Sequence, residues 1–186
     1  MSYLLRAFLK NEWEKNNSKA LKDFYADPIT KCIKTSKNTL SVWVSSTNDF
    51  SSIEMKDLIL AFASSTQQPA TLDFILLDES ILLSESIEII ETEGVTKFYQ
   101  QNEKHRDLCN LTYEKLGIVS QHIMNQFSVK ENSYRITLGK ILELMADAVK
   151  GDSPKIALAD LSESWQKHVQ KVLNRPPKEA NTTTKP

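Results

Sequence analysis

The sequence predicts an α+β fold in which a small mixed β-sheet of three to four strands is packed by helices and the C-terminal half is helical. Hydrophobic residues make up 40% and charged residues 25% of the 186 residues, which is close to a globular average and predicts a buried core. The chain holds 4 glycines and 6 prolines, a composition that favours long regular elements over a loop-rich β fold. Runs typical of strands occur before Gly94, and helical periodicity follows it.

Two helical segments are expected at the start of the chain. Over residues 2–15 the large apolar side chains share one helical face, while the charged side chains lie elsewhere. Ser18 is a candidate N-cap for a second segment over residues 19–26. Asp27 and Pro28 are expected to end that segment, because the residue before a proline disfavours helical backbone.

A β-hairpin is expected over residues 29–46. Residues 39–46 are rich in β-branched side chains and alternate in polarity, which is typical of a half-buried strand. Lys37 and Asn38 are candidates for the turn that joins this strand to a weaker arm over residues 29–35.

A helix and two more strands are expected between residues 50 and 91. The helix occupies residues 50–65 with Ser51 or Ser52 as its N-cap. The apolar run over residues 72–77 is short enough for a buried strand, and residues 87–91 supply one more. A strand, a helix and a strand thus follow one another, which predicts a right-handed parallel crossover, and the hairpin then makes the sheet mixed.

Everything after Gly94 is expected to be helical. We expect helices over residues 95–127 and 133–150, and a last helix that follows a cap at Ser153 and runs to about residue 174.

The predicted elements divide the chain into an α/β part over residues 1–94 and a helical part over residues 95–174 that packs on it within one compact domain. Residues 175–186 contain three prolines and no large apolar side chain. This composition predicts a disordered tail.

The cysteine content indicates a reducing compartment. Cys32 and Cys109 are too few for a disulfide framework and do not form a C-x-x-C motif. No apolar stretch approaches the roughly 20 residues of a membrane span, and no signal peptide is recognisable. We therefore expect a cytoplasmic protein that does not contact a membrane.

Motifs for cofactors are missing from the sequence. The four glycines are too far apart for a G-x-G-x-x-G or Walker loop. His105 and Cys109 have the i, i+4 spacing of a zinc-binding pair, but on a straight helix His122 is rotated about 100° from the first and about 140° from the second. We therefore expect no cofactor and no metal site, and we interpret these residues as part of the core.

Charge is segregated along the chain. The net charge is +4 over residues 1–37, −9 over residues 38–95 and +4 over residues 96–186, although the whole chain carries only −1. An acidic middle between mildly basic ends is typical of a solvated face or of a docking patch for a basic partner. Four glutamates are the candidates for partner binding. They are Glu85, Glu88, Glu91 and Glu93.

The acidic middle also allows a metal-dependent interpretation. Carboxylates at the end of a strand can hold Mg²⁺ for phosphoryl or nuclease chemistry. The candidates are Asp73, Asp78 and Glu79. The lysine that a metal nuclease is expected to carry near its carboxylates is missing, since none follows Asp73 until Lys97.

The sequence therefore predicts a non-catalytic interaction or regulatory protein that binds a partner protein through the acidic middle or through an amphipathic helix stripe. A second copy of the chain is a further candidate partner. The alternative is a metal-dependent hydrolase or nuclease that uses the acidic cluster. A second alternative is a weak nucleic-acid binder, against which the negative net charge argues. Its basic candidates are Lys31, Lys34, Lys37, Lys167, Lys171, Arg175 and Lys178.

Overall fold

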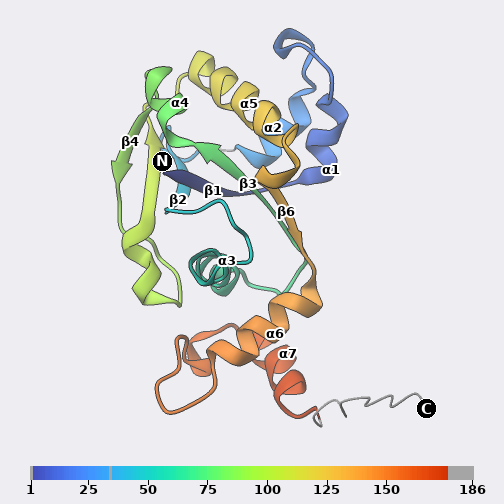
Figure 1. The fold of residues 1–186 in the computed structure, drawn as a ribbon, viewed down its shortest axis with the longest axis vertical. Coiled ribbons are helices and arrows are strands. Elements are labelled where there is room, and N and C mark those ends of the chain that lie inside the picture. The colour runs from blue at the N-terminus through green and yellow to red at the C-terminus, as the bar shows by residue number, and fades with distance from the viewer. Residues whose placement is uncertain (1, 34, 176–186) are drawn as a thin grey trace, which may run out of the picture.

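The computed structural model describes residues 2–33 and 35–175. Across these residues the chain forms a six-stranded sheet in the order β4-β5-β2-β1-β3-β6, and every pair of neighbouring strands is antiparallel. Helices cover both faces, so the molecule has three layers (Figure 1). The α+β class is confirmed, but the expected mixed sheet of three to four strands is wrong. The strands are β1 (Tyr3–Phe8), β2 (Leu40–Ser45), β3 (Leu72–Asp78), β4 (Glu88–Glu91), β5 (His105–Cys109) and β6 (Ser133–Ile136).

β1 is the element that makes the observed topology differ from the predicted one. The expected helix over residues 2–15 is instead this strand followed by the short helix α1 (Lys10–Trp13). β1 lies between β2 and β3, with Leu5 opposite Trp43 on one side and Leu76 on the other. Because β1 is covered on both faces, its apolar positions do not alternate, and the pattern resembles a helical stripe. β1 also separates β2 from β3, so the predicted parallel crossover becomes two antiparallel pairings.

β3 is buried on both faces, as its continuous apolar run predicts. Phe74 and Leu76 pack into one hydrophobic core, and Ile75 and Leu77 pack into the other. The two cores lie on opposite faces of the sheet, which explains why the run contains almost no polar position.

One helical layer covers the face of the sheet to which Leu5 points. It consists of α3 (Ile53–Ser65), α6 (Leu138–Ala148) and α7 (Glu163–Leu173) (Figure 1). Ser52 caps α3 as predicted, whereas Ser162 rather than the predicted Ser153 caps α7. Trp165 of α7 is fully buried, and its Nε1 donates to the carbonyl oxygen of Thr66 at 3.0 Å, which fastens α7 to the end of α3.

The second helical layer covers the opposite face. It consists of α1, α2 (Ala26–Cys32), α4 (Glu79–Ser84) and α5 (Tyr113–Phe127). α2 replaces the predicted first arm of the hairpin. Pro28 lies in the first turn of α2, where its missing N–H has no helical partner to lose, so it does not end a helix as expected. Lys37 and Asn38 form the predicted turn before β2, both with positive φ.

Short 3-10 helices connect these elements. They are η1 (Glu14–Asn16), η2 (Leu21–Asp23), η3 (Tyr99–Lys104), η4 (Lys130–Asn132) and η5 (Leu158–Asp160). No helix among the described residues is long and apolar enough to cross a membrane.

The C-terminal half is not all helical, contrary to the prediction. η3, β5 and α5 replace most of the expected helix over residues 95–127, and β6 and α6 replace the one over residues 133–150. The two strands have 5 and 4 residues, too few to show a period beside the helices that follow. Thr112 and Thr137 cap α5 and α6. The division of the chain at residue 94 stays a prediction, and all but the first residue of the expected tail lies outside the described residues.

A buried histidine joins α5 to the end of β3. His122 is 4% exposed, and its Nε2 accepts a hydrogen bond from the backbone N–H of Asp78 at 2.9 Å. A ring nitrogen that accepts carries no proton, so this contact requires the neutral imidazole. Burial lowers the pKa of His122, although the nearby charge of Asp78 acts in the opposite direction.

We predict that the free energy of unfolding falls as the pH decreases below about 6.5, the ordinary range of histidine. In this range the imidazole of His122 is protonated in the unfolded state but stays neutral in the folded state. One such histidine changes the free energy of unfolding by at most roughly 1.4 kcal/mol per pH unit. His105, whose pKa is also lowered by burial, adds to the loss. Urea denaturation between pH 7.5 and pH 5 measures the effect. His122→Gln keeps an acceptor without titrating and should reduce the pH slope; equal slopes in both proteins would contradict the assignment.

Candidate functional site

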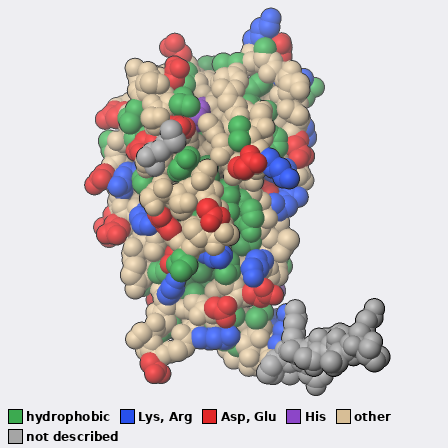
Figure 2. Space-filling view, in the orientation of Figure 1, with side chains coloured by type: hydrophobic (Ala, Val, Ile, Leu, Met, Phe, Trp, Pro, Cys, Tyr) green, Lys and Arg blue, Asp and Glu red, His purple; other side chains and the backbone are tan. Residues whose placement is uncertain are grey.

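The four glutamates predicted to bind a partner lie together on one edge of the sheet. Glu88 and Glu91 begin and end β4, Glu85 follows α4 just before it, and Glu93 lies just after it. All four side chains are exposed, and β4 is one of the two terminal strands of the described sheet. Figure 2 shows acidic side chains along the side of the molecule on which β4 runs in Figure 1. We call β4 with these four glutamates the acidic edge.

The backbone of β4 has a free side. The N–H of Thr92 donates to the carbonyl oxygen of His105 in β5 at 3.4 Å, and the hydrogen-bonding direction alternates along an antiparallel strand. Glu88 and Ile90 therefore face β5, and the N–H and C=O groups of Ile89 and Glu91 point outward. No other described strand pairs with this outer side.

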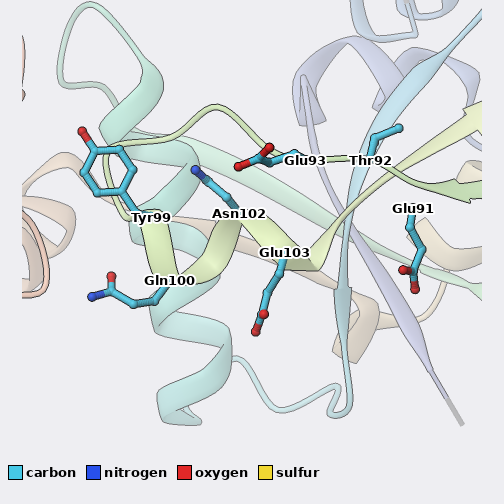
Figure 3. Close-up of a pocket in the computed structure, with 7 residues that line it drawn as sticks. All are labelled: Glu91, Thr92, Glu93, Tyr99, Gln100, Asn102 and Glu103. Atoms are coloured by element: carbon cyan, nitrogen blue, oxygen red, sulfur yellow. The ribbon is translucent and has the colours of Figure 1, made fainter.

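A shallow acidic hollow continues the acidic edge beyond the end of β4. Its volume is about 670 Å³. It is lined by Glu91, Thr92, Glu93, Tyr99, Gln100, Asn102 and Glu103 (Figure 3). The three carboxylates stand apart in Figure 3 and do not converge on one point. Glu91 is paired with Arg106 at 2.8 Å, whereas Glu93 and Glu103 form no ion pair with any described residue. The negative charges of Glu93 and Glu103 are therefore not compensated by ion pairs and favour the approach of a cation.

Tyr99 stands at the rim of the acidic hollow. The residue is 60% exposed, and its hydroxyl donates to Asp160 at 3.2 Å, which holds the ring in place. The charge of Asp160 also raises the pKa of Tyr99. Sequence reasoning does not group Tyr99 and Glu103 with the acidic edge, because both fall in the expected helix; only the return of η3 beside β4 brings them there.

The floor of the acidic hollow is fixed by Asn102. Its Oδ1 accepts from Thr96 Oγ1 at 2.7 Å and from the Thr96 N–H at 3.1 Å, and its carbonyl oxygen accepts from the Gly94 N–H at 2.9 Å. A Cβ on Gly94 would lie 3.1 Å from the Cβ of His105 and 3.2 Å from the Asn102 carbonyl oxygen. Glycine thus allows the loop to lie against β5.

The carboxylates of the metal-dependent alternative are not brought together. Asp73 and Asp78 lie at opposite ends of β3, roughly 17 Å apart by strand rise. Both oxygens of Asp73 bind Arg135, at 2.6 Å and 2.9 Å. Asp78 caps α4 by accepting from the N–H groups of Ser80 and Ile81, and Glu79 opens that helix. No group of three His, Cys, Asp or Glu among the described residues is arranged to hold a metal ion.

The histidines and cysteine of the zinc interpretation are also apart. His105 and Cys109 lie on β5, not on a helix, roughly 13 Å from each other by strand rise. His105 Nδ1 is 2.7 Å from Thr92 Oγ1, while His122 contacts the end of β3 from α5. Burial raises the pKa of Cys109, which opposes a reactive thiolate.

The two basic strings of the nucleic-acid alternative are only partly described. Lys31 is engaged with Glu12 at 3.0 Å and with Asp27 at 3.4 Å. Lys34 and Lys178 lie outside the described residues. Lys37 lies in the turn before β2, whereas Lys167 and Lys171 lie on α7, so the described members belong to separate elements.

We predict that Asn102→Ala lowers the free energy of unfolding by about 1–3 kcal/mol, because it leaves the N–H of buried Thr96 without an acceptor and removes one of the two acceptors of its hydroxyl. Gln100→Ala is the matched control: it lines the same hollow from an exposed position and should change stability by less than about 0.5 kcal/mol. Chemical denaturation measures both. Equal effects of the two changes would show that Asn102 does not fix the loop.

Comparison with known protein families, curated proteins and solved structures found no match to this chain.

Proposed function

We propose that the protein is a non-catalytic interaction protein that binds a basic, extended segment of a partner protein along β4. The observation that carries the proposal is the coincidence of four exposed glutamates with an unpaired strand edge. An extended peptide can add to such an edge by main-chain hydrogen bonds, while its side chains supply specificity.

The order of side chains on β4 defines the partner. β4 reads Glu-Ile-Ile-Glu from residue 88 to residue 91, and Ile90 is 39% exposed. In a paired strand, residues directly opposite one another interact, and opposite charges are favourable there. The complementary segment therefore places basic residues opposite Glu88 and Glu91 and apolar residues opposite the two isoleucines. Because the pattern of β4 is the same in both directions, it sets the composition of the segment and not its orientation.

The acidic hollow extends the same surface. A Lys or Arg that follows the paired segment reaches Glu93 and Glu103, and the exposed ring of Tyr99 offers a face for the cation. The hollow thus favours a third basic residue in the partner, beyond the four residues that pair with β4.

A second copy of the chain is not favoured at this edge. Antiparallel pairing of two β4 strands in register places Glu88 of one copy opposite Glu91 of the other, and like charges that face each other are destabilising. Charged side chains on an edge also protect against unwanted pairing in general. Binding of a basic segment distinguishes a docking function from protection alone.

We predict that a short peptide with a central Lys-Ile-Ile-Lys binds the protein in fluorescence anisotropy, and that binding weakens as salt is raised. The same peptide with Glu-Ile-Ile-Glu should not bind. Glu88→Lys with Glu91→Lys should abolish binding of the basic peptide. Glu114→Lys with Glu131→Lys, an equal charge change at exposed positions away from β4, should leave it nearly unchanged apart from a weak long-range effect.

The mode of binding is tested separately by amide hydrogen exchange. Strand addition should protect the amides of Ile89 and Glu91, which point outward in the free protein, more than those of Glu88 and Ile90. Binding without this alternating protection would support an electrostatic contact but contradict strand addition. Equal binding of the basic and acidic peptides would contradict the proposed function as a whole.

A further inference from the structure

A small pocket lies between α4 and α5, two helices of the second helical layer (Figure 1). Its volume is about 210 Å³, and we call it the α4–α5 pocket. The residues of α5 that line it are spaced by three or four positions, so they belong to one face of the helix. Leu21 and Ile81 are 41% and 42% exposed, so the pocket opens to solvent. The apolar part of the lining consists of Leu21, Ile81, Leu82 and Ile118.

His122 is the buried polar residue of the pocket lining. It is 4% exposed, and its Nε2 accepts from the backbone N–H of Asp78 at 2.9 Å. Because Nε2 accepts, the proton of the neutral ring is on Nδ1, which is therefore a hydrogen-bond donor. The contact with Asp78 thus fixes both the orientation and the tautomer of the ring.

The Nδ1 donor of His122 has no partner in the described part of the chain. It forms no hydrogen bond there, yet it is not enclosed by protein as the unpartnered indole nitrogens of Trp13 and Trp43 are. His168 on α7 shows the usual alternative, because its Nδ1 lies 2.7 Å from the carbonyl oxygen of Ser164, four residues earlier. The Nδ1–H of His122 is therefore accessible from the pocket and lacks an acceptor. Such a group is normally satisfied by a ligand or by an ordered water.

The polar residues at the rim of the pocket restrict the charge of a ligand. Glu85 is exposed and forms no ion pair with any described residue, so its negative charge disfavours an anion in the pocket. Gln121 Nε2 donates to Asn125 Oδ1 at 3.0 Å. This pair retains an unused carbonyl oxygen and unused N–H groups. The pocket thus offers both donors and acceptors beside its apolar walls.

We propose that the α4–α5 pocket binds a neutral carboxamide on a short apolar stem, with the carbonyl oxygen of the ligand on the Nδ1–H of His122. The carbonyl supplies the acceptor that Nδ1 lacks, and the amide N–H groups find acceptors in Glu85 and Gln121. A carboxylate supplies the same acceptor but meets the like charge of Glu85, whereas an ammonium group supplies no acceptor. The apolar stem favours the ligand over water, because the apolar walls offer a water molecule no hydrogen bonds.

The size of the pocket limits the ligand to a small group. The volume is below the roughly 300–1,000 Å³ typical of drug-sized ligands, so the pocket fits a small amide or the end of a larger ligand, such as a glutamine side chain. Glu85 also belongs to the acidic edge. The inference does not rest on the proposed function, because it requires neither strand addition to β4 nor a basic partner.

The test is titration of the protein with isovaleramide, isovalerate and isobutyl methyl ketone, which share one apolar stem and differ in the group on the carbonyl carbon. We expect isovaleramide to produce a saturable shift of the His122 Nδ1 nitrogen resonance, assigned by its loss in His122→Gln. A dissociation constant in the roughly millimolar range is expected for a ligand of so few atoms. The ketone, which only accepts, should bind more weakly, and isovalerate should not saturate.

The source of the carboxamide is distinguished by a fourth compound, N-acetylglutamine methylamide, which carries the same group on a peptide. Tighter binding of this compound than of isovaleramide would identify the ligand as a side chain of a protein or peptide. Weaker binding would identify it as a free small molecule.

Variants at the exposed rim keep the test independent of folding. Glu85→Gln removes the like charge and should raise the affinity for isovalerate by roughly tenfold, whereas Glu103→Gln, an equal charge change in the acidic hollow, should leave it unchanged. Ile118→Trp fills the pocket and should abolish binding of isovaleramide, and Ile118→Val should retain it.

Three results would each overturn the proposal and leave an ordered water as the partner of His122. The first is the absence of a saturable shift with isovaleramide. The second is an affinity for isovalerate or for the ketone equal to that for the amide in the original chain. The third is an unchanged response to isovaleramide in a folded Ile118→Trp variant.

Discussion

The central position of β1 is the constraint on which the rest of the structure depends. β1 pairs with β2 on one side and with β3 on the other, and β5, β4 and β6 are added outward from these two neighbours. Its two faces belong to different cores, since Leu4 and Phe8 pack on the α5 side and Leu5 packs on the α3 side. Loss of this strand would divide the sheet into two halves and expose apolar surface on both faces. Burial of apolar surface is the largest favourable contribution to folding, so this loss would strongly destabilise the protein.

A sheet that is extended outward from a central strand has two terminal strands, and in this protein their side chains make different contacts. At β6, Arg135 forms a two-point contact with Asp73 of the neighbouring strand, and the ring of Tyr134 stacks on Phe50 at 4.8 Å. At β4, exposed carboxylates surround a free backbone edge instead. These charges oppose pairing with apolar or acidic strands and favour a basic one, so protection against aggregation and the proposed choice of a basic partner have the same electrostatic cause.

Local signals predict part of this fold, and contacts between distant segments decide the rest. The turn at Lys37 and Asn38, the cap at Ser52, and the strands β2, β3 and β4 each follow from a short stretch of sequence. β1 and β5 do not, because a strand covered on both faces, or one of five residues, shows no period of two. The four glutamates line one edge because one strand and its flanks carry them, and a docking surface does not require them to converge. Asp73 and Asp78 are as close in sequence, but the length of the extended strand separates them, and a metal site requires convergence.

The side chain of Arg6 closes the gap where β1 diverges from β2. Where the strands separate, the carbonyl of Ser41 and the carbonyl of Cys32 at the end of α2 need donors from elsewhere, and Arg6 supplies both. A side-chain amide would use its two N–H groups in making these contacts, whereas a guanidinium retains three. The two contacts therefore tie the end of α2 to the sheet at the position where the pairing of β1 with β2 stops. A charged side chain thus takes the place of main-chain pairing at this position and joins the second helical layer to the centre of the sheet.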